Sequence, residues 1–158
     1  MNRVAVDSTE LPLWAWNLPL KRFAHKVLSE LGKDKWDLSV LLCGDETIAD
    51  LNSRYRGKPQ ATDVLSFSMD EGKQFPSGPS SGTRFLPGDI VISLDSMREN
   101  SRRHKIDEDE ELRRLLIHGI LHLGGMDHRS NNKTEPMLLL QEEILAKLTG
   151  EHILGSNA

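Results

Sequence analysis

Apolar residues along this chain follow two spacings, one typical of amphipathic helices and one typical of short strands. Residues 17–31 carry apolar side chains three or four positions apart and are followed by Gly32, which predicts a helix and its end. The same spacing predicts four further helices. A short one follows Gly44 and reaches residue 55, and one capped by Asp95 runs to about residue 103. A third is capped by Asp107, with Glu110 three residues later as in a capping box, and the last opens over residues 134–136 and closes at Gly150.

Short apolar runs predict three strands, over residues 38–43, 64–68 and 90–94. We expect the first dozen residues to be irregular and residues 70–87, rich in Gly, Pro and Ser, to form a long loop that is either disordered or functional. The alternation of helices and strands predicts an α+β fold, in which a small mixed β-sheet packs with several α-helices. The helix that opens at Asp107 is apolar on most sides, so we expect it at the centre of the fold.

Composition and charge are those of a globular protein, and 158 residues predict a single domain over residues 1–158. The net charge of −4 argues against a surface that binds nucleic acid everywhere, but it is compatible with a local basic groove. The single cysteine, Cys43, excludes an internal disulfide and favours a reducing compartment. Because no apolar run reaches membrane-spanning length and the N-terminus lacks a signal pattern, we expect a cytoplasmic protein with no membrane partner.

The most informative segment is the run from His118 to His128, which reads His-Gly-Ile-Leu-His-Leu-Gly-Gly-Met-Asp-His. His118 and His122 are one helical turn apart and therefore share a face of their helix. Gly124 and Gly125 end that helix, which lets the chain turn back and bring His128 toward the same point. Three imidazoles that converge in this way predict a zinc site whose fourth position is left for water, as in catalytic rather than structural zinc centres.

Other interpretations of this run stay open from the sequence. One is that the three histidines are unrelated, although a buried helix must then supply partners for bare imidazole nitrogens. The same spacing also occurs in zinc proteases of the metzincin type, which place a glutamate base directly after the first histidine, where this chain has Gly119. Asp127 is either an acceptor that orients one imidazole or a turn residue. The identity of the metal is also open, because imidazole ligands suit divalent metals other than zinc.

Basic residues gather in two other segments. Arg54, Arg56 and Lys58 lie within five residues just before a predicted strand, and three more cations lie between residues 102 and 105. Either set can be a solvated helix end, where cations are favourable. Alternatively, Arg56 or Lys58 contacts a phosphate, which the planar guanidinium of arginine suits, and the second set forms one wall of an RNA groove.

Three motifs, in this order along the chain, carry a resemblance to a known family. They are Asn52-Ser53-Arg54-Tyr55-Arg56-Gly57-Lys58 followed by Thr62-Asp63-Val64-Leu65-Ser66-Phe67, then Gly88-Asp89-Ile90-Val91-Ile92-Ser93, and finally the histidine run. On these motifs, over about residues 38–148, the chain resembles the YbeY family of bacterial metal-dependent endoribonucleases.

The resemblance implies a zinc ion, or another divalent metal, bound by His118, His122 and His128. It implies that single-stranded RNA is the substrate, that RNA and the ribosome rather than DNA are the partners, and that Arg56 is catalytic together with His118 and His122. The implied role is maturation of ribosomal RNA, notably at the small-subunit 3′ end, and ribosome quality control. The alternatives are a non-catalytic zinc-containing ribosome-assembly factor and a metzincin-like metalloprotease, and the attacking group, water or the RNA 2′-OH, stays open.

Overall fold

The computed structural model describes residues 1–9, 16–69 and 84–154 of the chain. Its elements are, in order, β1 (Arg3–Ser8), α1 (Asn17–Glu30), β2 (Trp36–Cys43), α2 (Asp45–Arg56), β3 (Val64–Ser68), β4 (Phe85–Ser93), α3 (Leu94–His104), α4 (Glu108–Leu123) and α5 (Pro136–Lys147). The strands form one sheet in the order β1-β2-β4-β3, in which β3 is antiparallel to β4 and the other pairs are parallel. The predicted α+β fold with a small mixed sheet is therefore confirmed.

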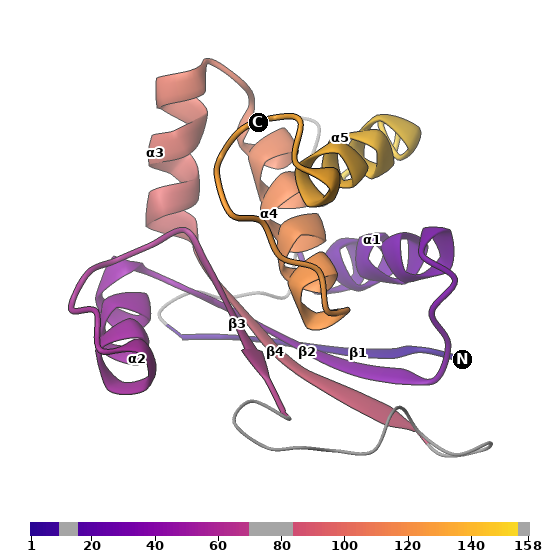
Figure 1. Ribbon diagram of the computed structural model, residues 1–158, viewed down its shortest axis with the longest axis horizontal. Coiled ribbons are helices and arrows are strands. Elements are labelled where there is room, and N and C mark those ends of the chain that lie inside the picture. The colour runs from indigo at the N-terminus through magenta and orange to yellow at the C-terminus, as the bar shows by residue number, and fades with distance from the viewer. Residues whose placement is uncertain (10–15, 70–83, 155–158) are drawn as a thin grey trace.

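The helices cover the two faces of the sheet unequally (Figure 1). α1, α3, α4 and α5 lie on one face, and α2 lies on the other. The side chains of β2 alternate between these faces, so that Leu38, Val40 and Leu42 enter the large core under the four helices. Cys43 instead joins Ile48 of α2 in a smaller core on the opposite face.

The histidine-bearing helix α4 is central, as its apolar pattern predicts. Its buried apolar side chains surround the helix on most sides: Leu112, Leu115, Leu116, Ile117, Ile120, Leu121 and Leu123. Within the described part of the chain, none of the helices combines the length and the apolar character needed to cross a membrane.

The expectation that the first dozen residues are irregular is wrong for residues 3–8, and residues 10–12 lie outside the described part of the chain. Residues 3–8 form β1, an edge strand that pairs in parallel with β2 over its whole length. Only Val4 and Val6 of this strand pack against the large core. Two alternating apolar residues are too short a pattern to distinguish a strand from a loop, and the pairing partner lies in a distant part of the sequence.

The strand predicted over residues 90–94 begins earlier, at Phe85, and ends at Ser93. Residues 85–87 therefore belong to β4 rather than to the predicted loop, of which residues 70–83 lie outside the described part of the chain. The extension pairs with the start of β2, and Phe85 N donates a hydrogen bond at 2.7 Å to the carbonyl of Lys35, the residue just before β2. Such pairing depends on the neighbouring strand, which the local pattern does not show.

The prediction that Asp95 caps α3 is also wrong. Ser93 is the N-cap, and its hydroxyl accepts a hydrogen bond from Ser96 N at 3.2 Å. Asp95 lies one residue inside the helix, and its carboxylate accepts from the first backbone N–H of α2 at 2.9 Å. At α4 the predicted cap is present, because Asp107 Oδ1 accepts from Glu110 N at 2.6 Å.

Candidate metal centre

Three histidines meet where α4 ends. His118 and His122 lie one turn apart on α4 with ring centroids 4.6 Å apart. After the helix ends, Gly125 adopts a φ of +98°, a backbone conformation that residues with a side chain rarely take. The turn brings the ring of His128 to 5.2 Å from that of His118. The three residues each offer one ligand atom, and these atoms lie within 4.8 Å of one another, so the predicted convergence is present.

Each imidazole is held at its Nδ1 atom by a carbonyl-type oxygen. The pairs are His118 with Gln141 Oε1 at 2.6 Å, His122 with Met126 O at 3.0 Å, and His128 with Ser130 O at 2.9 Å. Such oxygens only accept hydrogen bonds, so each Nδ1 must carry the proton and donate it. In a neutral imidazole the Nε2 atom then has no proton and presents a lone pair.

The Nε2 atoms of His118 and His122 are 3.1 Å apart. With both Nδ1 atoms protonated, two lone pairs face each other, which is unfavourable unless a proton or a metal cation is shared between them. Burial lowers the pKa of both imidazoles below the usual 6.5, so an additional proton is disfavoured. A divalent cation satisfies both nitrogens, and neutral imidazole is a common zinc ligand. The residues present therefore fit a zinc ion.

Among the residues that the structure describes, no fourth histidine, cysteine or carboxylate joins this group. Asp127 lies beside it, but its Oδ1 is 4.0 Å from Nδ1 of His122, the nitrogen that faces away from the shared point. The same oxygen accepts a hydrogen bond from the backbone N of His128 at 2.8 Å. Asp127 therefore hydrogen-bonds the backbone rather than an imidazole. Three protein ligands are the number typical of catalytic zinc, whereas structural zinc usually has four.

Gln141 of α5 is a site residue that the sequence did not single out. Its Oε1 holds His118, and its Nε2 donates to Glu142 Oε2 at 3.1 Å, which fixes the orientation of the amide. Glu142 is held in turn by Arg114, through bonds of 2.9 and 3.0 Å, and these bonds lower the pKa of Glu142. The available signal was a buried amide one turn after Met137, on the face of α5 that otherwise buries apolar residues.

Gly119 sets how closely α4 approaches the sheet. A Cβ atom at this position would lie 2.8 Å from Cγ2 of Ile90 on β4. The Gly119 carbonyl accepts a hydrogen bond from Ser66 Oγ of β3 at 3.3 Å, which ties the edge strand to the helix turn between the two histidines. The position that holds a glutamate base in metzincins therefore has no room for a side chain in this fold.

Arg56 lies outside the histidine group but is connected to it through β3. It is the exposed last residue of α2, and its guanidinium donates to Ser66 O at 2.6 Å. The guanidinium carbon also lies 5.2 Å from the centre of the Phe67 ring. Because Ser66 bonds both Arg56 and Gly119, one residue links the arginine to the helix turn that carries His118.

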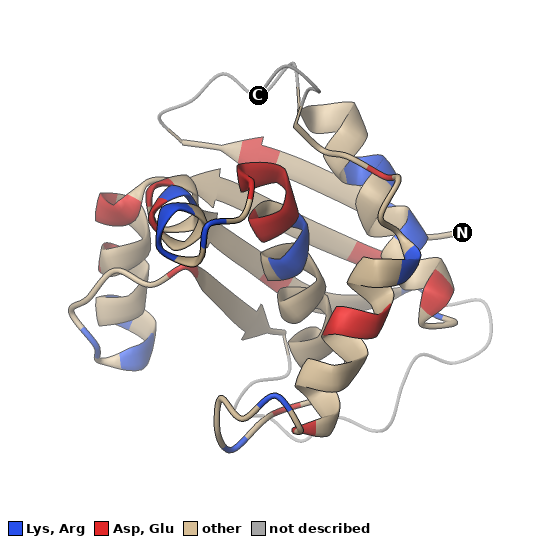
Figure 2. Ribbon diagram, turned by 90° about the horizontal axis from the view of Figure 1, so that it is seen from above, with Lys and Arg blue, Asp and Glu red and all other residues tan. Residues whose placement is uncertain are grey.

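A cleft of about 770 Å³ borders the centre, between α3, α4 and α5. Gln141 lines it, so the cleft reaches the side chain that orients the first histidine. Asp63, Arg103 and Lys133 also line it, and the cleft therefore carries both signs of charge. Figure 2 shows acidic and basic residues interspersed along the helices.

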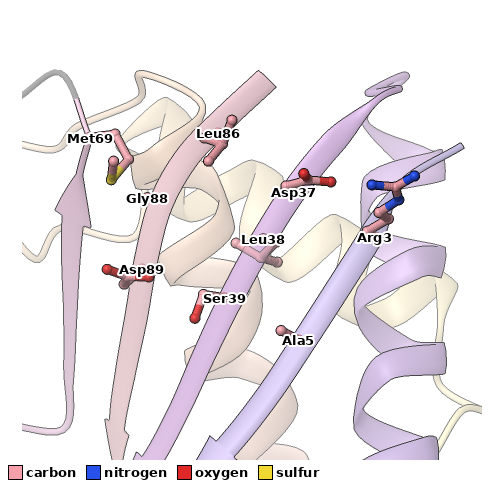
Figure 3. A pocket seen from close by; sticks show the side chains of 9 residues that line it. All are labelled: Arg3, Ala5, Asp37, Leu38, Ser39, Met69, Leu86, Gly88 and Asp89. Carbon is pink, nitrogen blue, oxygen red and sulfur yellow. The ribbon is translucent and has the colours of Figure 1, made fainter. Parts of the chain in front are cut away.

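A second pocket, of about 340 Å³, lies on β1, β2 and β4 (Figure 3). Arg3, Asp37 and Asp89 are among its lining residues, and none of the three histidines lines it.

Comparison with known proteins identifies the family. The family model described as endoribonuclease YbeY matches residues 9–149. This chain belongs to the endoribonuclease YbeY family. The YbeY match begins well before residue 38, the first residue of the resemblance seen in the motifs, and so includes α1.

Individual YbeY relatives are similar over most of their length. The endoribonuclease YbeY of Treponema denticola is 46% identical over 126 residues, which are 80% of this chain and 79% of the relative. That of Treponema pallidum strain Nichols is 46% identical over 148 residues, 93% of this chain and 90% of the relative. The solution structure of a Thermotoga maritima protein superimposes with a TM-score of 0.62 at 26% identity, covering 94% of this chain and 90% of that one.

Proposed function

We propose that this chain is a zinc-dependent endoribonuclease that cleaves single-stranded RNA and acts in ribosomal RNA maturation at the small-subunit 3′ end and in ribosome quality control, with the ribosome as partner. The observation that carries the proposal is the set of three imidazoles whose Nδ1 atoms are each held by an oxygen and which each place one ligand atom within 4.8 Å of the others. The relatives named endoribonuclease YbeY supply the reaction class. We also propose that the catalytic unit is the single domain predicted from the sequence.

His118, His122 and His128 would hold the zinc ion. When bound, zinc supplies a Lewis acid that stabilises the negative charge developing on the phosphodiester. The three neutral ligands leave the full dipositive charge in place, which suits an anionic substrate. Burial keeps His118 and His122 in their neutral form near pH 7, and the oxygens at Nδ1 fix the orientation of each ring.

Arg56 binds a non-bridging phosphate oxygen in this proposal. A guanidinium is planar and permanently charged, so it can neutralise the phosphodiester without a change in protonation. The hydrogen bond to Ser66 O and the contact with Phe67 hold it in one orientation at the edge of β3. A pre-oriented cation stabilises charge in the transition state without reorganising during the reaction.

The alternative functions are less well supported. A metzincin-like protease requires a general base at the position of Gly119, where Ile90 excludes a side chain. A non-catalytic assembly factor with structural zinc requires a closed set of ligands, and the group of described residues contains three.

Metal analysis combined with an RNA cleavage assay tests the proposal. We expect about one zinc ion per purified chain, loss of cleavage of single-stranded RNA after chelation, and recovery when zinc is added back. His122→Ala should lose zinc and cleavage together, whereas His25→Ala, which replaces a histidine of α1 outside the group, should keep both. Cleavage at the wild-type rate by metal-free His122→Ala protein would refute the proposal.

The ends of the cleaved RNA identify the attacking group. Attack by the substrate 2′-OH leaves a 2′,3′-cyclic phosphate, whereas attack by water leaves a linear phosphate. Mapping the ends on a defined oligonucleotide therefore separates the two routes that the sequence left open, without altering the protein.

A further inference from the structure

Tyr55 is a large aromatic residue that the fold leaves on the surface. It lies in the last turn of α2, next to Arg56, and 65% of it is exposed. Its ring meets the Phe67 ring edge-on, with centroids 5.5 Å apart and an interplanar angle of 64°. An edge-on contact of this kind supports the tyrosine ring while leaving much of it open to solvent.

Phe67 anchors this arrangement to the protein interior. It packs against the small core formed by Cys43, Ile48 and Val91 on the α2 face of the sheet. The same ring contacts Tyr55 and the Arg56 guanidinium, so one anchored residue holds both an exposed aromatic and a cation. Tyr55 is therefore presented on a fixed support rather than on a loose helix end.

Tyr55 and Phe67 are also connected to the metal centre. Phe67 follows Ser66 on the edge strand β3, and Ser66 bonds both Arg56 and the α4 carbonyl next to His118. A polynucleotide bound with one phosphate at Arg56 would pass Tyr55 with an adjacent base, because successive bases and phosphates alternate along a single strand.

We propose that Tyr55 is a stacking platform for one unpaired base of single-stranded RNA, adjacent to the phosphate contact of Arg56. The proposal rests on the proposed function for the identity of the ligand, and it adds a binding residue to that site. Aromatic faces stack on all four bases, and single-stranded RNA exposes bases that a duplex hides. Arg54, Arg56 and Lys58, all exposed, lie within three residues of Tyr55 along the chain and supply positive charge for a polynucleotide, although Arg54 also pairs with Asp50 at 2.9 Å.

The chain contains one tyrosine, so a tyrosine probe reports on this position alone. Protein carrying ring-labelled tyrosine should show one set of ring signals by NMR. Addition of a short single-stranded RNA should move these signals upfield, because a stacked base shields the ring. An oligonucleotide of equal length and charge whose residues lack bases should bind through its phosphates. It should shift the tyrosine signals no more than an equivalent addition of salt does.

The outcomes separate this proposal from the function on which it rests. RNA that binds and is cleaved while the tyrosine signals stay unchanged would overturn the platform alone. Equal shifts with the normal and the base-free oligonucleotide would also overturn it, because they would report charge rather than stacking. If fluorescence anisotropy shows that the protein does not bind RNA, and only a protein partner shifts the tyrosine signals, both proposals would be overturned.

Kinetics provide a second readout. Tyr55→Ala should raise KM for single-stranded RNA about tenfold with kcat within about twofold, since stacking aids binding and does not touch the reacting atoms. Tyr55→Phe keeps the ring and should behave as the wild type. Leu18→Ala, at a residue of α1 that is 68% exposed, is the matched control and should change neither constant. An unchanged KM in Tyr55→Ala, or an equal loss in Tyr55→Phe, would contradict a stacking role.

Discussion

Replacement of Gln141 by leucine tests whether the protein holds its histidines ready for a metal. The change removes the Oε1 atom that accepts from His118 Nδ1 at 2.6 Å and keeps a side chain of similar size. His118 would then lose both its fixed ring orientation and the partner of its Nδ1 proton. Among the described residues, the other two imidazoles bond backbone oxygens at Nδ1, so Gln141 is the side chain through which this support can be removed by substitution.

The expected magnitude follows from the role of such acceptors. Loss of a hydrogen-bond partner behind a metal-bound histidine typically lowers metal affinity about 10- to 100-fold, which is about 1.4–2.7 kcal/mol. Because the contact is short and Gln141 is buried, we expect Gln141→Leu to fall in the upper part of this range. Gln141→Glu retains an acceptor and should preserve zinc affinity. Its unfolding free energy should fall modestly, because the amide that donates to Glu142 at 3.1 Å becomes a carboxylate.

Competition with a chromophoric chelator at pH 7.5 measures the zinc dissociation constant directly. Glu143→Gln changes an exposed residue of the same helix and serves as the control for general effects on α5. Thermal unfolding of the metal-free proteins shows whether each variant folds. A folded Gln141→Leu protein whose dissociation constant lies within twofold of the wild-type value would show that the hydrogen bond to His118 does not organise the site.

Three further substitutions test other parts of the argument. Gly119→Ala should lower the free energy of unfolding by about 1–2 kcal/mol and Tm by about 2–8 °C, because the clash with the stiff Ile90 side chain outweighs the gain in helix propensity; a Tm above the wild-type value would contradict the close packing. Arg56→Lys keeps the charge but loses the planar fork, so kcat/KM for RNA should fall about 10²-fold with unchanged Tm, and wild-type kinetics would remove Arg56 from the mechanism. Asp109→Asn should destabilise the protein by about 2–4 kcal/mol at pH 7 in denaturant titrations, because the buried carboxylate accepts from the backbone N–H of Leu154 and from three other donors. Burial acts to raise the pKa of Asp109, but these hydrogen bonds outweigh it and hold the pKa below 3.8. The wild-type protein should therefore be more stable than Asp109→Asn by the full amount above pH 3.8, and this difference in unfolding free energy should disappear as the pH falls through the lowered pKa. A stability difference that persists below that pKa would contradict the role given to the carboxylate.

The sequence pattern was sufficient to predict those features of the fold and the site that depend on residues close together in the chain. The spacing of His118 and His122 places them on one helix face whatever surrounds the helix, and the two glycines that follow allow the turn toward His128. Because α4 carries apolar residues on most of its sides, it must be buried on most sides, and this places the histidine-bearing helix at the centre of the fold. Asp107 capped its helix as predicted because a cap acts over three residues.

Tertiary contacts decided the features whose partners lie far apart in the chain. β1 exists as a strand because it pairs with β2, and Asp95 serves the start of α2 because that helix packs beside α3. The partner of the first histidine, Gln141, lies on a different helix; its place on the apolar face of α5 indicates burial but does not show which side chain it meets. A spacing along one helix specifies which side chains share a face, but the group that orients each of them, and the room left at Gly119, depend on how separate elements pack, and the sequence pattern does not encode that packing locally.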